Sequence, residues 1–154
     1  PQVIDTQGVH TLSNDLIIEG IPSFHDEVQG QKRGNNLIFC IRSEGMQVVH
    51  LGDLGHELDA GTCARIGKTD ILLIPVGGYF TIDTQTAYRV AEQLKPSVIL
   101  PMHYKTVYNR DWPIAGPEDF LSLYPEKVEK LNLLRVTRED LSCQPKVALL
   151  QYLT

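Results

Sequence analysis

Two short, almost purely apolar segments, DILLIPV at 70–76 and SVILPM at 97–102, restrict the fold more than any other feature of the chain. Such strands are typical of a parallel sheet that is buried on both faces. Between them, Asp83 suits a helix N-cap and Pro96 ends the helical pattern. The apolar stripe of this helix consists of Ala87, Val90, Ala91 and Leu94. The chain therefore predicts a βαβ unit and an α/β fold class.

The remaining pattern adds an antiparallel part and further helices. We expect strands at 15–22, 36–43, 47–51, 132–136 and 146–152, and helices at 59–66 and 116–125. The turn SEG at 43–45 predicts a hairpin between two of these strands. Gly67 ends the first of these helices, and Pro117 lies in the first turn of the second. The predicted architecture is a mixed α/β (α+β) sheet with flanking helices.

Composition limits the class of protein. With 154 residues and 42% hydrophobic content, the chain predicts one domain over 1–154. A formal net charge of −5 excludes the basic surface of a nucleic-acid binder, and no apolar run is long enough to span a membrane. Three scattered cysteines, Cys40, Cys63 and Cys143, form no CxxC pair. We expect a soluble protein of the reducing cytoplasm.

Three polar side chains follow predicted strands at the point where each strand ends. His25 comes after one apolar run, Asp53 after VVHL, and His103 after VILPM. In an α/β fold, residues past the carboxyl ends of strands can meet in one crevice. Each also has a plain alternative, because a histidine after a strand is often a hydrogen-bonded surface residue and Asp53 suits an Asx turn. Convergence is therefore possible but not established by the spacing.

If the three side chains converge, their chemistry suits a metal ion. Two imidazoles and one carboxylate fit zinc, with manganese or iron as alternatives, and leave a position for water. Such a metal activates water for hydrolysis. The pair Gly77–Gly78 lacks the spacing and the lysine of a phosphate-binding P-loop, so a turn close to the site is the better interpretation. The segment 29–34, QGQKRG, predicts a solvated loop, with contact to an anionic substrate as the lesser alternative.

The order of the segments GIPSFHD, HLGDLGH, DILLIPVGG and PMHYKT resembles the metallo-β-lactamase superfamily. The nearest branch is its small metal-dependent hydrolases, which are similar to ascorbate-phosphate lactonases. The resemblance implies the C-terminal part of an αβ/βα sandwich. It also implies that His25 binds a first metal, Asp53 bridges two metals and His103 binds the second.

The resemblance implies further residues on the substrate side of the site. Gly77, Gly78 and Tyr79 line its mouth, and Tyr104 is a weaker candidate. Asp53 and His103 are the expected catalytic residues. The substrate is expected to be a small ester, lactone, amide or phosphate-containing molecule.

The chain departs from this family in one large respect, because the motif HxHxDH and the usual opening strand pair are absent. We therefore expect an incomplete domain with an exposed sheet edge and an exposed apolar face. A missing N-terminal fragment or a second copy of the chain would cover them. His25, Asp53 and His103 would hold at best one ion with reduced affinity.

Two alternatives to the hydrolase stay open. The first is a non-catalytic scaffold or assembly module that lacks the first-half metal ligands. The second, which we rank last, is a mononuclear iron protein that uses two histidines and one carboxylate.

Overall fold

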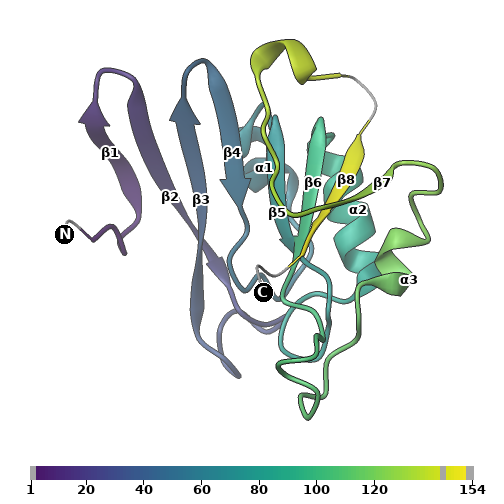
Figure 1. Cartoon of the computed structure of the whole chain (residues 1–154). Coiled ribbons are helices and arrows are strands. Elements are labelled where there is room, and N and C mark those ends of the chain that lie inside the picture. Colours follow the sequence, from purple (N-terminus) through teal and green to yellow (C-terminus); the bar gives the residue numbers. More distant parts are fainter. Residues whose placement is uncertain (1–2, 143–144, 152–154) are drawn as a thin grey trace.

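A computed structural model describes residues 3–142 and 145–151. Eight strands form one sheet in the order β1-β2-β3-β4-β5-β6-β8-β7 (Figure 1). The strands are β1 (Gly8–Ser13), β2 (Leu16–Phe24), β3 (Asn35–Ser43), β4 (Met46–His50), β5 (Ile71–Pro75), β6 (Val98–Met102), β7 (Val128–Leu131) and β8 (Lys146–Leu150). The helices are α1 (Ala60–Ile66), α2 (Thr84–Leu94), α3 (Glu118–Leu121) and the 3₁₀ turn η1 (Arg138–Asp140). The predicted mixed sheet with flanking helices is confirmed.

The first four strands form an antiparallel meander. The predicted hairpin is confirmed, since Ser43 pairs with Met46 across a two-residue turn. Glu44 and Gly45 have φ values of 51° and 72°, as a type I′ turn requires.

The other strands are parallel, and they include the predicted βαβ unit β5-α2-β6. Asp83 caps α2 by accepting the N–H of Thr86 at 2.8 Å. The helix ends at Lys95 in the left-handed region, directly before Pro96. The sequence signals at both ends of this helix were therefore interpreted correctly.

Four elements differ from the prediction. β1 was not predicted, because none of its six residues is buried and the strand pairs only with β2. Residues 132–136 form no strand; the strand is Val128–Leu131, which pairs with β8. Pro117 is the N-cap of α3, not part of its first turn, and α3 spans only four residues. β8 ends at Leu150, and residue 152 of its predicted range lies outside the described residues.

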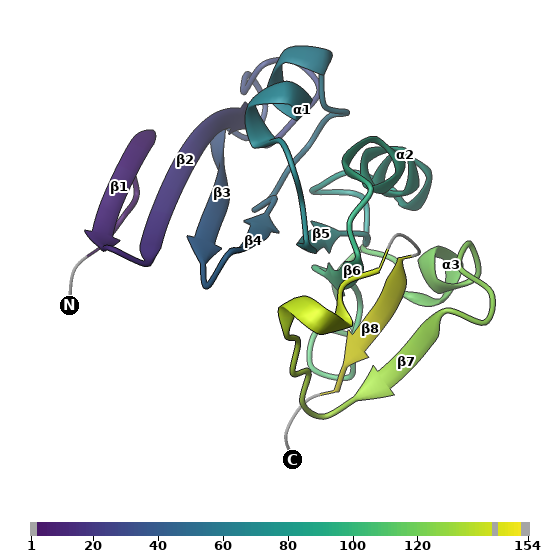
Figure 2. The ribbon, with the colours of Figure 1, turned by 90° about the horizontal axis from the view of Figure 1, so that it is seen from above.

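One face of the sheet packs against α1 and α2, which lie on the same side in Figure 2. The side chains of this face are buried, and one row across the strands consists of Cys40, Val49, Leu72 and Ile99. The next residue along each strand points to the opposite face because side chains alternate. In the described part of the chain, no helix is long and apolar enough to cross a membrane.

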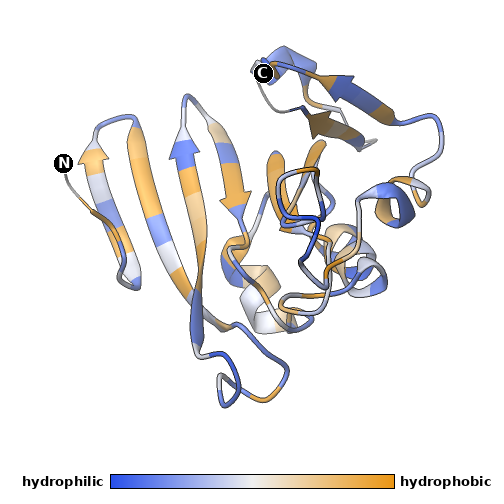
Figure 3. Cartoon of the chain, turned by 60° about the horizontal axis from the view of Figure 1, so that its bottom comes forward, coloured by the Kyte–Doolittle hydropathy of each residue, from blue (hydrophilic) through white to orange (hydrophobic). Residues whose placement is uncertain are grey.

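The opposite face of the sheet is apolar but only partly buried, and Figure 3 shows hydrophobic residues along its strands. A row of four paired residues crosses it: Ile18, Ile41, Val48 and Ile71. All four are partly exposed, while Cys40 and Val49 on the helix side are fully buried. This exposed apolar face, called the open face below, agrees with the expectation from the sequence. The prediction of a single domain over 1–154 stays a prediction.

Candidate functional site

The candidate residues lie along one edge of the sheet. β2 and β4 both run antiparallel to β3, and β4, β5 and β6 are parallel, so all four strands point the same way. His25 follows β2 directly, Asp53 follows β4, Gly77 follows β5, and His103 follows β6. This carboxyl edge lies at the bottom of Figure 1. It is where an α/β sheet assembles a site.

Asp53 and His103 approach each other across this edge. The Oδ1 atom of Asp53 lies 3.9 Å from Nε2 of His103. That separation is too long for a hydrogen bond but short enough for one metal ion to contact both atoms. The carboxylate is half exposed and the imidazole is mostly buried. The pair can hold a cation between its two facing atoms.

Gly77 lets the chain after β5 lie directly against His103. A Cβ atom at position 77 would lie 2.2 Å from the carbonyl oxygen of His103. The predicted close approach of this turn to the site is thereby explained. His103 itself has a φ of 51°, a region that costs energy for a residue other than glycine. The surrounding chain therefore imposes this conformation on His103.

Asn36, which sequence reasoning missed, holds the turn that carries Asp53. Its Oδ1 accepts the N–H of Asp53 at 3.0 Å. Its Nδ2 donates to Oγ of Ser23 at 2.7 Å and to the carbonyl of Leu51 at 2.9 Å. Gly52, with a φ of 61°, makes the tight turn directly before Asp53. Asparagine is unfavourable in a strand, so Asn36 at the start of an apolar run was the available signal.

Two buried imidazole nitrogens at this edge have no hydrogen-bond partner, Nε2 of His25 and Nδ1 of His103. Buried polar atoms in proteins are nearly always paired, so each orphan calls for a partner. However, no group of three or more His, Cys, Asp or Glu side chains within 3–142 and 145–151 is arranged to hold a metal. The structure thus brings Asp53 and His103 together, and the third position of His25 stays a prediction.

The two other histidines near Asp53 serve the fold. His50 lies on β4, and its Nδ1 accepts the N–H of Gly52 at 3.0 Å. Burial lowers the pKa of His50, and the nearby Asp53 offsets this only in part. The lowered pKa favours the neutral imidazole, which can accept this hydrogen bond. His56 lies in the following loop, where its Nε2 accepts the N–H of Phe24 at 3.2 Å.

The mouth of the site is more aromatic than predicted. Gly77 and Gly78 are buried, and Tyr79 is 64% exposed. Tyr104 is partly buried and packs against the core. The ring of Phe80 stands edge-on to His103 at 6.4 Å and to Trp112 at 6.1 Å. Sequence reasoning missed Phe80 and Trp112, although Trp112 is the only tryptophan of the chain.

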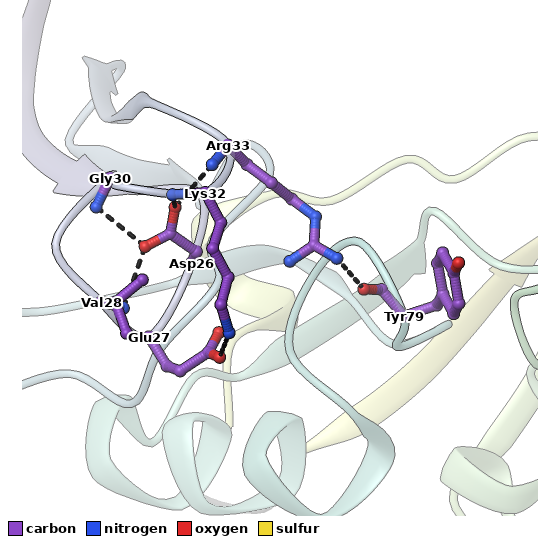
Figure 4. Close-up of polar contacts among 7 residues, drawn as sticks. All are labelled: Asp26, Glu27, Val28, Gly30, Lys32, Arg33 and Tyr79. Atoms are coloured by element: carbon purple, nitrogen blue, oxygen red, sulfur yellow. Dashed lines mark hydrogen bonds and ion pairs between the residues drawn. The ribbon is translucent and has the colours of Figure 1, made fainter.

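The loop 29–34 is mostly exposed, as predicted, and its backbone is also held in place. The carboxylate of Asp26 accepts the backbone N–H groups of four loop residues (Figure 4): Val28, Gly30, Lys32 and Arg33, at 2.7–2.9 Å. Burial raises the pKa of Asp26, but these four bonds outweigh it and lower the pKa to about 2. Asp26 therefore stays ionised and fixes the position of Arg33.

Comparison with known proteins gives consistent matches. Residues 1–103 match the sequence model described as the β-lactamase superfamily domain. A UPF0173 metal-dependent hydrolase of Pyrococcus furiosus is 32% identical over 137 residues, covering 84% of this chain and 59% of the relative. A UPF0173 metal-dependent hydrolase of Pyrococcus abyssi is 31% identical over 137 residues, which again cover 84% of this chain and 59% of the relative. The chain thus spans less than two thirds of these relatives.

Two solved structures are similar to this chain. A proposed zinc-dependent hydrolase of the metallo-β-lactamase superfamily from Thermotoga maritima is 39% identical, with a TM-score of 0.84. The match covers 97% of this chain and 71% of that one. Igni18, described as a metallo hydrolase of Ignicoccus hospitalis, is 26% identical with a TM-score of 0.59, over 78% of this chain and 51% of that one.

Proposed function

Because the chain belongs to the metallo-β-lactamase superfamily, we propose that it carries part of the active site of a metal-dependent hydrolase. The observation that carries the proposal is the 3.9 Å approach of Asp53 to His103 at the carboxyl edge. The orphaned Nε2 atom of His25 at the same edge supports it. Asp53, His103 and His25 are the proposed metal ligands.

Zinc is the proposed metal, with manganese and iron as alternatives, since a carboxylate and imidazoles suit all three. The metal supplies Lewis acidity and lowers the pKa of a bound water. The residues of this chain hold the cation, and the turn at Gly77–Tyr79 borders the place where substrate enters. The proposed substrate is a small ester, lactone, amide or phosphate-containing molecule.

The site needs a further segment, and we place that segment on the open face. A groove of about 780 Å³ lies beside it and is lined in part by Phe39, His50 and Asp53. A segment docked there would bury the partly exposed row that contains Ile41 and Val48 and would bring further ligands next to Asp53. We propose a segment with the HxHxDH motif, N-terminal or separate, as the partner; a second copy of the chain is the alternative.

The compartment is also a proposal. Cys40 and Cys63 are free thiols in the described part of the chain, which supports a reducing cytoplasm. No nucleic acid or membrane is a proposed partner.

A non-catalytic assembly module is the second candidate function. It is favoured by one observation: in the described residues no three metal-binding side chains are arranged as a site. Such a module would use the open face for assembly and would bind no metal.

The test is hydrolysis of a panel of esters, lactones and phosphate esters by the protein with any segment that accompanies it. Activity should disappear with chelator and return with zinc or manganese. Asp53→Ala should abolish it, while the control Asp15→Ala, an exposed aspartate in the turn between β1 and β2, should keep it. Circular dichroism checks that both variants fold.

Full activity in Asp53→Ala, or in the presence of chelator, would overturn the hydrolase proposal. Intact mass and native mass spectrometry identify the partner. A bound N-terminal fragment supports the first partner, and a homodimer supports the second. A lone chain with metal-dependent activity would refute both.

A further inference from the structure

Arg33 reaches from the loop after β2 to the mouth of the candidate site. Its Nη2 atom donates a hydrogen bond to the carbonyl of Tyr79 at 2.8 Å, as Figure 4 shows. Its guanidinium carbon lies 5.9 Å from the centre of the Phe80 ring. Phe80 in turn contacts His103, one of the proposed metal ligands. The guanidinium is thus two contacts away from His103.

The charge of Arg33 is available to a ligand. In the described part of the chain, no carboxylate forms an ion pair with Arg33. A guanidinium has five N–H donors, and the bond to Tyr79 uses one of them. The neighbouring Lys32 differs, because its ammonium pairs with Glu27 and points away from Tyr79 (Figure 4).

Three aromatic side chains lie beside this cation. Tyr79 stands edge-on to Phe80 with ring centres 4.7 Å apart, and Phe80 stands edge-on to Trp112. Tyr79 is 64% exposed and Trp112 is 50% exposed, so both rings are accessible to a ligand. We call Tyr79, Phe80 and Trp112 the aromatic shelf. Exposed rings beside a metal-binding edge favour a flat apolar ligand.

The position of Arg33 is fixed before any ligand arrives. Its backbone N–H donates to Asp26 at 2.7 Å, within the four-bond cluster that holds the loop. The hydrogen bond to Tyr79 and the contact with Phe80 fix the other end of the side chain. Because the side chain is held at its backbone and at its guanidinium, it loses little conformational freedom when it binds an anion.

We infer that Arg33 and the aromatic shelf bind substrates that carry an anionic group, a carboxylate or a phosphate, next to a flat apolar group. This deepens the proposed function and rests on it for the identity of the site. Arg33 binds the anion by charge-assisted hydrogen bonds, and the shelf contacts the apolar part. Arg33 is therefore a determinant of substrate specificity rather than a catalytic residue.

The test uses the fluorescence of Trp112, the only tryptophan of the chain, as the report of binding. Phenylacetate, phenyl phosphate and the neutral phenylacetamide are titrated into the protein in the presence of chelator. Either anion should bind at least fivefold more tightly than the amide, and Arg33→Gln should remove roughly that preference. Arg33→Lys should keep part of it. Lys32→Gln, with the same loss of charge in the same loop, should leave it unchanged.

The inference is overturned if phenylacetamide binds as tightly as both anions, or if Arg33→Gln and Lys32→Gln behave alike. The preferred anion tells a carboxylate-bearing substrate from a phosphate-bearing one. Because chelator is present, the result does not depend on metal. A protein without metal-dependent hydrolysis can still pass this test, and an active hydrolase can fail it, so the two proposals fail separately.

Discussion

Substitution of Gly77 by alanine should damage the candidate site through a single backbone contact. The added Cβ would lie 2.2 Å from the carbonyl oxygen of His103, whereas ordinary contacts begin at 3.4 Å. It would also lie 3.1 Å from the Cα of Tyr104. Both neighbours are backbone, so the chain after β6 must move by about 1 Å. That segment carries His103.

The expected cost follows from this overlap. Overpacking of this size destabilises a protein by about 1–3 kcal/mol, which corresponds to roughly 2–4 °C in Tm for each kcal/mol in a chain of this length. Displacement of a functional group by about 1 Å can reduce activity about 100-fold. Gly77→Ala should therefore lower Tm by several degrees and lower metal-dependent activity far more than stability alone explains.

Gly116→Ala is the matched control. There the added Cβ would lie 2.1 Å from Oε2 of Glu118, the end of a flexible exposed side chain that can rotate away. Differential scanning calorimetry and zinc affinity should distinguish the two variants, with Gly116→Ala within about 0.5 kcal/mol of the unmodified protein. If Gly77→Ala were as stable and bound zinc as tightly as this control, the close packing of Gly77 on His103 would be refuted.

Three further predictions concern the loop and the core. The folded-state pKa of Asp26 is lowered to about 2, so its contribution to stability is complete above the unfolded pKa of about 3.9 and is lost as the pH falls toward 2. In urea unfolding, the difference in free energy of unfolding between the unmodified protein and Asp26→Asn should be constant above pH 5 and should shrink below pH 4. A constant difference down to pH 2 would contradict this prediction. Burial raises the pKa of Cys40 to about 11, so iodoacetamide at pH 8 should modify the partly exposed Cys63 before Cys40. Peptide mass spectrometry measures the two rates of modification, and equal rates would refute the burial of Cys40. Leu72→Ala should cost about 2–5 kcal/mol in urea unfolding, because Leu72 is fully buried, against less than about 0.5 kcal/mol for the exposed Leu133→Ala.

The elements that could be predicted from the sequence are those whose signals are local. Asp83 and Pro96 fix the ends of α2, Asp59 and Gly67 fix those of α1, and Glu44–Gly45 forms the hairpin turn. Each of these signals acts through the backbone of its own few residues. They would be the same in any fold.

The elements that could not be predicted depend on distant partners. The apolar run at 132–136 looks like a strand, yet its Leu133 is 66% exposed, and VEKL at 128–131 forms the strand because β8 lies beside it. β1 likewise exists because β2 offers an edge to pair with. Strand formation is decided by such neighbours more than by local preference.

The candidate site divides in the same way. That Asp53 and His103 each follow a strand could be predicted, but their meeting at one edge depends on the parallel pairing of β4 with β5, which the sequence did not establish. The supporting residues could not. Asn36 lies on the antiparallel strand β3 and contacts Asp53 across the sheet. Arg33 reaches Tyr79 because Asp26 holds the loop that runs from Asp26 to Arg33.

Zinc titration of the purified protein, together with any segment that accompanies it, tests the central claim most directly, because it needs no substrate. Calorimetry of the unmodified protein should show a zinc site that disappears in Asp53→Ala and in His103→Ala but persists in Asp15→Ala. Absence of zinc binding by the unmodified protein, or binding that survives both substitutions, would contradict the assignment of this edge as a metal site.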